Sequence, residues 1–82
     1  DEAGERYATW RRAIARGAGA DSGAAIRALR ERLADDLDTP GALRAIDDWA
    51  AATLAGESGD AGAGTAVATA VDGLLGVRIA TA

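Results

Sequence analysis

One short run, residues 33–43, constrains the fold more than any other stretch; it reads Leu-Ala-Asp-Asp-Leu-Asp-Thr-Pro-Gly-Ala-Leu. The Thr39 hydroxyl can accept a hydrogen bond from a first-turn amide, and Pro40 needs no amide proton at the first helical position. Acidic residues just before a helix favour the positive end of its dipole. We therefore predict a corner at which one helix ends near Asp35 and the next begins at Pro40. Its structural cap is expected to consist of Asp38, Thr39 and Pro40.

Apolar residues recur at helical spacing in four segments, which are residues 1–16, 24–35, 40–55 and 65–75. Glycine-rich runs separate them, and residues 56–64 have the composition of a flexible linker. No segment alternates as a strand would, and short connections between amphipathic helices favour antiparallel neighbours. The sequence therefore predicts an all-α fold, a small four-helix, mostly antiparallel bundle that forms one domain over residues 1–82.

Two further helix boundaries carry capping signals. Asp21 and Ser22 are both candidate N-caps for the second segment, because their side-chain oxygens can accept hydrogen bonds from first-turn amides. Gly76 follows the fourth segment and is a candidate C-cap, because glycine readily adopts the left-handed conformation.

The residue types that the chain lacks restrict its chemistry. It has no His, Cys or Met among its 82 residues. Because the usual zinc sites, cysteine nucleophiles and Ser-His triads need His or Cys, we predict no catalytic, cofactor-binding or metal-binding residue in this segment. No apolar run approaches the ~20 residues that cross a bilayer and no signal peptide is evident, so we expect no membrane partner and a cytoplasmic location. The missing start Met predicts a piece of a longer polypeptide.

The charge balance is acidic. The formal net charge is −4, and all nine basic residues are Arg. Phosphate binding needs a clustered basic surface, so this balance argues against a nucleic-acid partner. The bias toward Arg, Ala and Gly is typical of a GC-rich genome.

Two patterns suggest ligand sites that have simpler explanations. The carboxylates within residues 35–38 could bind a hard cation, but the glycine and distal glutamate of a calcium loop are absent. Gly17-x-Gly19 is similar to a phosphate-binding loop, but no strand precedes it, and Ser22 stands where a third Gly belongs. We interpret the first pattern as helix capping and the second as a plain interhelical loop.

The run at residues 33–43 resembles a signature in the C-terminal helical bundle of the class I cysteinyl-tRNA synthetases, acidic-acidic-hydrophobic-Asp/Asn-Thr-Pro-x-Ala-Leu. It is even more similar to a related family, the cysteine ligases of mycothiol biosynthesis. Three further stretches are similar to these ligases: residues 6–14 with Trp10-Arg11-Arg12-Ala13, residues 43–50, and the ending at residues 71–77, Val-Asp-Gly-Leu-Leu-Gly-Val. We favour the ligases, because the chain is acidic and stops soon after this ending, whereas the synthetases continue into a domain that helps to recognise the anticodon.

The resemblance implies an ATP-dependent, AMP-forming parent enzyme. In that family ATP activates cysteine as an adenylate, and the amine of glucosaminyl-inositol attacks it to form an amide. ATP and zinc are implied for the parent enzyme but not for this segment, which lacks both nucleotide-binding signatures and the zinc ligands. The implied partner is the nucleotide-binding catalytic domain of the same enzyme, whose mobile signature loop this bundle would support.

The docking surface for that domain is a hypothesis about five residues. Arg11, Arg12 and Arg16 gather at the end of the first segment, where they could instead complement the helix dipole. Trp10 and Trp49 lie in apolar stripes, which favours a core or docking role over stacking on a base or sugar. We hypothesise that these five side chains form the docking surface.

Two other functions stay open at this point. The segment could be the helical, tRNA-contacting bundle of a cysteinyl-tRNA synthetase, which a basic extension beyond Ala82 would support. It could also be a free-standing helical interaction domain, which would carry its own start Met.

Overall fold

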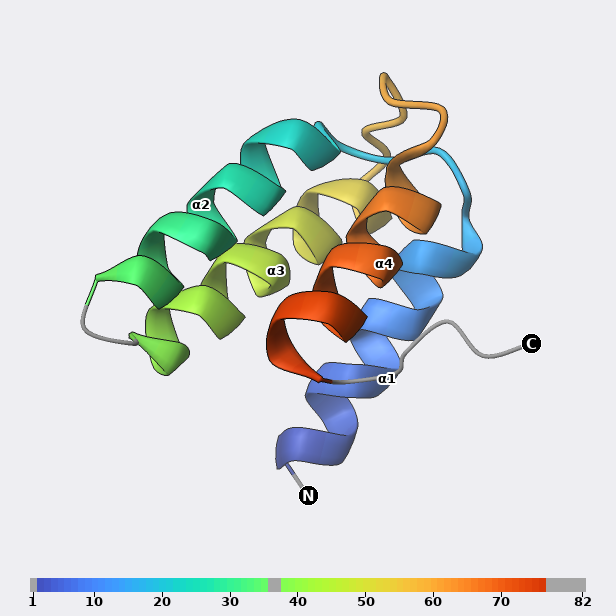
Figure 1. Cartoon of the computed structure of the whole chain (residues 1–82). Coiled ribbons are helices and arrows are strands. Elements are labelled where there is room, and N and C mark those ends of the chain that lie inside the picture. The colour runs from blue at the N-terminus through green and yellow to red at the C-terminus, as the bar shows by residue number, and fades with distance from the viewer. Residues whose placement is uncertain (1, 36–37, 77–82) are drawn as a thin grey trace.

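Four helices build the protein. A computed structural model describes residues 2–35 and 38–76, and within these ranges the helices are α1 (Glu2–Ala15), α2 (Ser22–Ala34), α3 (Thr39–Leu54) and α4 (Ala63–Leu75) (Figure 1). No strand is formed in the described part, so the predicted all-α bundle of four helices is confirmed. None of these helices is long and apolar enough to cross a membrane.

The corner between α2 and α3 is capped by Asp38. Its carboxylate accepts a hydrogen bond from the Gly41 amide at 2.9 Å, and Thr39 is already the first helical residue, followed by Pro40. The prediction that Thr39 is the capping residue, with Pro40 first in the helix, is therefore wrong by one position. The physical reason is that the Asp38 carboxylate, one residue earlier, reaches the orphan first-turn amide and adds a negative charge at the positive helix end. Asp36 and Leu37 of the signature lie outside the described residues.

At the ends of α2 and α4 the structure shows which of the predicted capping residues form a cap. Asp21 is the N-cap of α2, and its carboxylate accepts the Ala24 amide at 3.2 Å, so α2 begins two residues before the predicted residue 24. Gly76 is the C-cap of α4 with φ of 70°, as predicted. Helix α4 begins at Ala63, inside the stretch predicted to be a linker.

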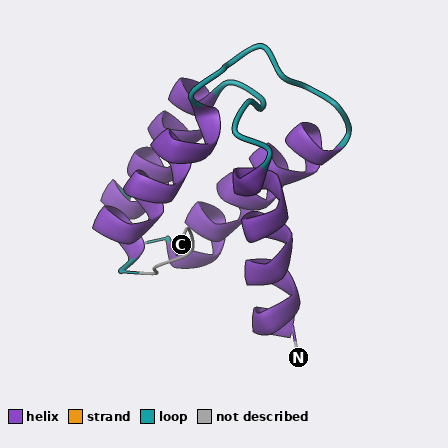
Figure 2. Cartoon of the chain, turned by 90° about the vertical axis from the view of Figure 1, so that its right-hand side faces the viewer, coloured by secondary structure: helices purple, strands orange, loops and turns teal. Residues whose placement is uncertain are grey.

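The helices pack in a ring in which chain neighbours are not always spatial neighbours. The main contacts join α2 with α3, α1 with α3, α2 with α4, and α1 with α4. In Figure 1, α2 and α3 lie side by side and run in opposite directions, whereas the connections that leave α1 and α3 pass together over one end of the molecule (Figure 2). The expectation that short connections make consecutive helices neighbours therefore applies mainly to the α2–α3 pair. The other two connections are longer and cross the bundle.

The core lies where the apolar stripes of the four helices meet. Its largest fully buried side chains come from all four helices: Trp10, Leu29, Ile46, Thr53, Val67 and Val71. Alanines on all four helices and Ala20 of the α1–α2 connection complete the core cluster. Small residues between a few large ones let the helices approach closely, which is how a chain with few large apolar residues fills its interior.

Asp60 ties the two long connections together. Its backbone exchanges two hydrogen bonds of 3.0 Å with Gly19 in an isolated antiparallel bridge. Its carboxylate accepts hydrogen bonds from the Ser22 hydroxyl and from the Ser22 amide, the latter at 3.0 Å, and from the Gly62 amide at 3.2 Å. The Ser22 hydroxyl and then the Ser22 amide hold the pKa of this carboxyl below its usual value. The predicted linker is thus held by specific hydrogen bonds.

Two glycines allow the backbone to approach at this end of the bundle. A Cβ atom at Gly64 would lie 2.4 Å from the Ile14 carbonyl oxygen, so α4 begins directly on the end of α1. A Cβ atom at Gly19 would lie 2.7 Å from the Thr53 hydroxyl oxygen. Only glycine fits these positions without displacing α1 or α3.

Candidate docking surface

Trp10 is a core residue. It is 0% exposed, and its indole N–H donates to the Asp47 carboxylate at 2.8 Å. Tyr7 packs edge-on against it with 5.4 Å between ring centroids, and Arg6 Nε lies 3.2 Å from the other Asp47 oxygen. The indole therefore has its polar and apolar partners inside the molecule, and Trp10 is not available to a docking partner.

Trp49 is also withdrawn from the surface. It is 4% exposed, and its indole N–H donates to the Ala20 carbonyl at 2.9 Å. The Thr53 hydroxyl accepts the Ala20 amide at 3.0 Å, so both polar backbone groups of Ala20 are paired with α3. The hypothesis that Trp10 belongs to a docking surface is wrong, because Trp10 is fully buried and its N–H group has an internal acceptor. Trp49 also faces the core, and only 4% of it is exposed.

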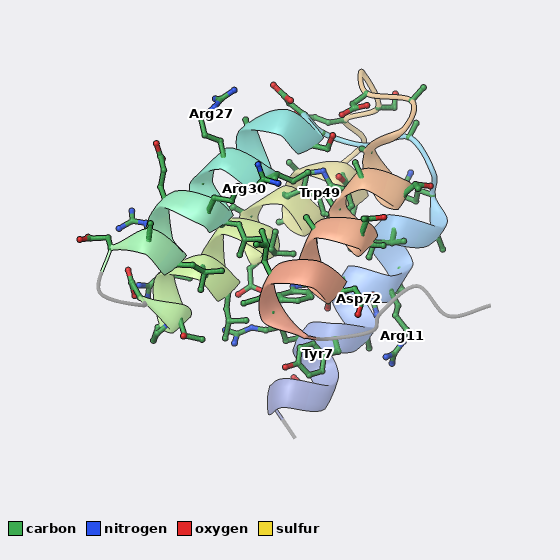
Figure 3. The ribbon with its side chains drawn as sticks, viewed as in Figure 1. Tyr7, Arg11, Arg27, Arg30, Trp49 and Asp72 are labelled. Atoms are coloured by element: carbon green, nitrogen blue, oxygen red, sulfur yellow. The ribbon has the colours of Figure 1, made fainter. Side chains whose placement is uncertain are left out.

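The three arginines of the hypothesis are exposed on α1 and just beyond it. Arg11 projects outward from α1, on a different side of the bundle from Arg27 of α2 (Figure 3). Arg16 Nη1 donates to the Leu54 carbonyl at 3.5 Å, so this cation lies at the C-terminal end of α3, where the helix dipole favours positive charge. Arg11 and Arg12 are exposed as well, but with both tryptophans buried they have no large apolar partner from the hypothesised set.

A hollow of about 340 Å³ lies between α2 and α3. It is open to solvent and is lined by Ala24, Ala28 and Ala45, which we call its floor, by Asp48 and Glu57, which we call its rim, and by Trp49. We call this feature the α2–α3 hollow. The sequence analysis missed it, although the i, i+4 spacing of Ala24 and Ala28 opposite an alanine of α3 was a usable signal for an unfilled helix–helix groove.

The hollow continues toward the corner as a second depression of about 220 Å³. Ala28, Ala45 and Asp48 line both depressions, and Arg32 and Arg44 line only the second one. Carboxylates are the only charged groups that line the larger depression, whereas Arg32 and Arg44 line the smaller one together with Asp48. Arg32 Nη1 lies 3.7 Å from Asp38, whereas Arg44 forms no ion pair with another described residue.

The residues of this segment do not fit a zinc ion. The chain has no His or Cys, and the described ranges bring no three acidic residues together as a metal-binding group.

Curated relatives with a named activity are similar to this chain over most of its length, whereas no protein-family model matches it. It is 53% identical over 75 residues to the L-cysteine:1D-myo-inositol 2-amino-2-deoxy-alpha-D-glucopyranoside ligase of Beutenbergia cavernae, which covers 92% of this chain and 18% of that protein. Identity to the same-named ligases is 53% over 77 residues in Geodermatophilus obscurus (92% of this chain, 18% of that protein) and 51% over 77 residues in Stackebrandtia nassauensis (94% and 18%).

The chain is homologous to the C-terminal segment of these ligases. The resemblance inferred from residues 33–43 is thereby confirmed at the level of the whole segment. The chain spans less than a fifth of the length of the relatives that it matches.

Proposed function

We propose that this chain is the C-terminal helical part of an ATP-dependent, AMP-forming ligase that joins cysteine to the amine of glucosaminyl-inositol. The observation that carries the proposal is the identity of more than half of the residues to ligases whose printed name contains both substrates, over 92% of this chain. In the proposed reaction the cysteine carboxylate attacks the α-phosphorus of ATP and releases pyrophosphate, which gives a cysteinyl adenylate. The amine then attacks the adenylate carbonyl, loses a proton and forms the amide as AMP leaves.

The bundle has a supporting role in this proposal and supplies no catalytic residue. The absence of His, Cys and Lys from its sequence supports this assignment. ATP and zinc would be held by residues elsewhere in the ligase. The partner of the bundle is the nucleotide-binding domain of the same polypeptide, and the proposed location is the cytoplasm, with neither a membrane nor a nucleic acid as partner.

The test uses the full-length protein that contains this segment. Incubated with ATP, cysteine and glucosaminyl-inositol, it is expected to release AMP and form the cysteinyl amide, both detected by mass spectrometry. Omission of either cysteine or glucosaminyl-inositol is the control. Transfer of cysteine to tRNA instead of the aminosugar would replace this proposal with the cysteinyl-tRNA synthetase alternative. Formation of neither product would leave a helical interaction domain without ligase activity.

A further inference from the structure

We propose that the α2–α3 hollow receives an arginine or lysine side chain from a segment of the same polypeptide outside these 82 residues. This inference deepens the proposed function and rests on it, because it names the face through which the bundle contacts the catalytic part. The inference depends on one observation: the alanine floor of the hollow lies beside carboxylates that form no ion pair with a described residue.

The floor of the hollow is apolar and unfilled. Ala28 and Ala45 are half-buried and line both depressions, and Trp49 lines the larger one. An apolar stem that lies in this hollow is stabilised there, because contact removes both the alanine methyl groups and the stem from water.

The rim is anionic and uncompensated. Within residues 2–35 and 38–76, neither Asp48 nor Glu57 forms an ion pair, and Asp21, the third carboxylate at this end, caps α2. Arg44 stands one helical turn before Asp48 and lines the smaller depression with it, but the two side chains form no ion pair. A cation that enters beside Asp48 and Glu57 therefore meets two carboxylates that the bundle itself does not neutralise.

Lysine and arginine match both parts of this surface. Their long aliphatic stems lie on apolar surface while the charged head reaches a polar rim. Arg32 and Arg44 line only the smaller depression, so a carboxylate of the same partner segment would face them there.

The length of the relatives argues for a partner within the same polypeptide. This chain matches only 18% of each relative, and under the proposed function the rest of the ligase is part of the same polypeptide. Covalent attachment gives a high effective concentration, which allows a small groove to be occupied without high intrinsic affinity.

Site-specific photocrosslinking in the full-length protein tests the inference. A benzoylphenylalanine replaces Ala45, which lines both depressions, and in a matched control it replaces Thr69, an exposed residue of α4. We expect the Ala45 probe to crosslink to one peptide outside the 82 residues that carries Arg or Lys. We expect the Thr69 probe to give no crosslink to that peptide.

Charge reversal shows whether the carboxylates of the rim contribute to binding of the partner segment. Asp48→Arg combined with Glu57→Arg is expected to lower the Ala45 crosslink yield about tenfold, because like charges then meet at the rim. Asp72→Arg reverses an exposed charge on α4 (Figure 3) and should leave the yield unchanged. Crosslinks between two isotopically distinguished copies, or no crosslink from Ala45, would overturn the inference. Ligase activity of the unsubstituted protein is measured in parallel, so that loss of the docking face and loss of the proposed function give different results.

Discussion

The bundle closes its corners in two different ways. The α2–α3 corner is held by residues close in sequence, since Asp38 caps α3 and its amide donates to the Arg32 carbonyl at 2.9 Å. The connections that follow α1 and α3 are held to each other, with Ser22 bonded to Asp60 across a separation of 38 residues. The comparison teaches that a local corner needs only its own residues, whereas the paired connections form their contacts only when the helices have assembled.

The largest expected effect comes from a variant that disturbs the contact between the start of α4 and the end of α1, beside the paired connections. Gly64→Ala places a Cβ atom 2.4 Å from the Ile14 carbonyl oxygen, so α4 must move off α1 at a cost of about 3 kcal/mol. Native-state hydrogen exchange of the α4 amides in the full-length protein measures the loss. Gly73→Ala is the control in the same helix, because its Cβ meets nothing within 4 Å. It should stabilise α4 by about 0.5–1 kcal/mol, and equal behaviour of the two variants would contradict the close approach.

A second prediction concerns the Thr53 hydroxyl, which binds the α1–α2 connection to α3. Thr53→Val removes the hydroxyl that accepts the Ala20 amide at 3.0 Å. Thr53 is 0% exposed, so a buried donor is left without its partner at a cost of about 2 kcal/mol. Thr53→Ser keeps the hydroxyl and is expected to lose less stability. Hydrogen exchange of the Ala20 amide distinguishes the two, and protection retained in the Val variant would show that this bond contributes little.

The third prediction separates the two kinds of corner by pH. Hydrogen bonds from Ser22 lower the pKa of Asp60, so the folded state binds the proton less readily than the unfolded state. The stabilisation is therefore present at neutral pH and is lost as pH falls from about 4 through the lower folded pKa. Asp60→Asn should lower the exchange protection of amides in the paired connections at pH 7. It should also flatten the decline of this protection below pH 4. Hydrogen exchange corrected for intrinsic rates measures both effects. If protection in this variant still declined below pH 4 as in the unsubstituted protein, the pH dependence would be due to other carboxyl groups.

The smallest expected effect is at the local corner. Asp38→Ala removes the acceptor of the Gly41 amide and should destabilise the start of α3 by about 1 kcal/mol. Asp38→Asn retains a capping oxygen and should lose only part of this. Exchange of the first-turn amides of α3 reports the change, and the paired connections should not respond. A response that spreads to the residues around Asp60 would mean that the two kinds of corner are coupled.

Much of the fold could be predicted because it depends on neighbours in sequence. Apolar spacing located all four helices, and capping chemistry located the end of α4 at Gly76. For the start of α2 it offered both Asp21 and Ser22, of which Asp21 is the cap. The corner at residues 38–40 was found with its cap displaced by one residue, because Asp38 and Thr39 both carry an oxygen suited to capping. That the segment forms one domain of a longer polypeptide stays a prediction.

The candidate site was predicted less well. The spacing of Trp10 and Trp49 showed that each lies on an apolar face, but it did not show what covers that face. The indole acceptors, Asp47 and Ala20, are 37 and 29 residues away in sequence. The α2–α3 hollow was missed for the same reason, since its floor joins alanines from two helices.

The sequence by itself determined the helices, the corner between α2 and α3, and the resemblance to cysteine ligases, because periodicity, capping and a linear signature are properties of adjacent residues. Only the tertiary structure decided which helices touch, that both tryptophans are internal, and that Asp60 joins two connections. Those outcomes depend on burial and hydrogen bonding between residues far apart in the chain, whose geometry exists only when the four apolar faces have packed together.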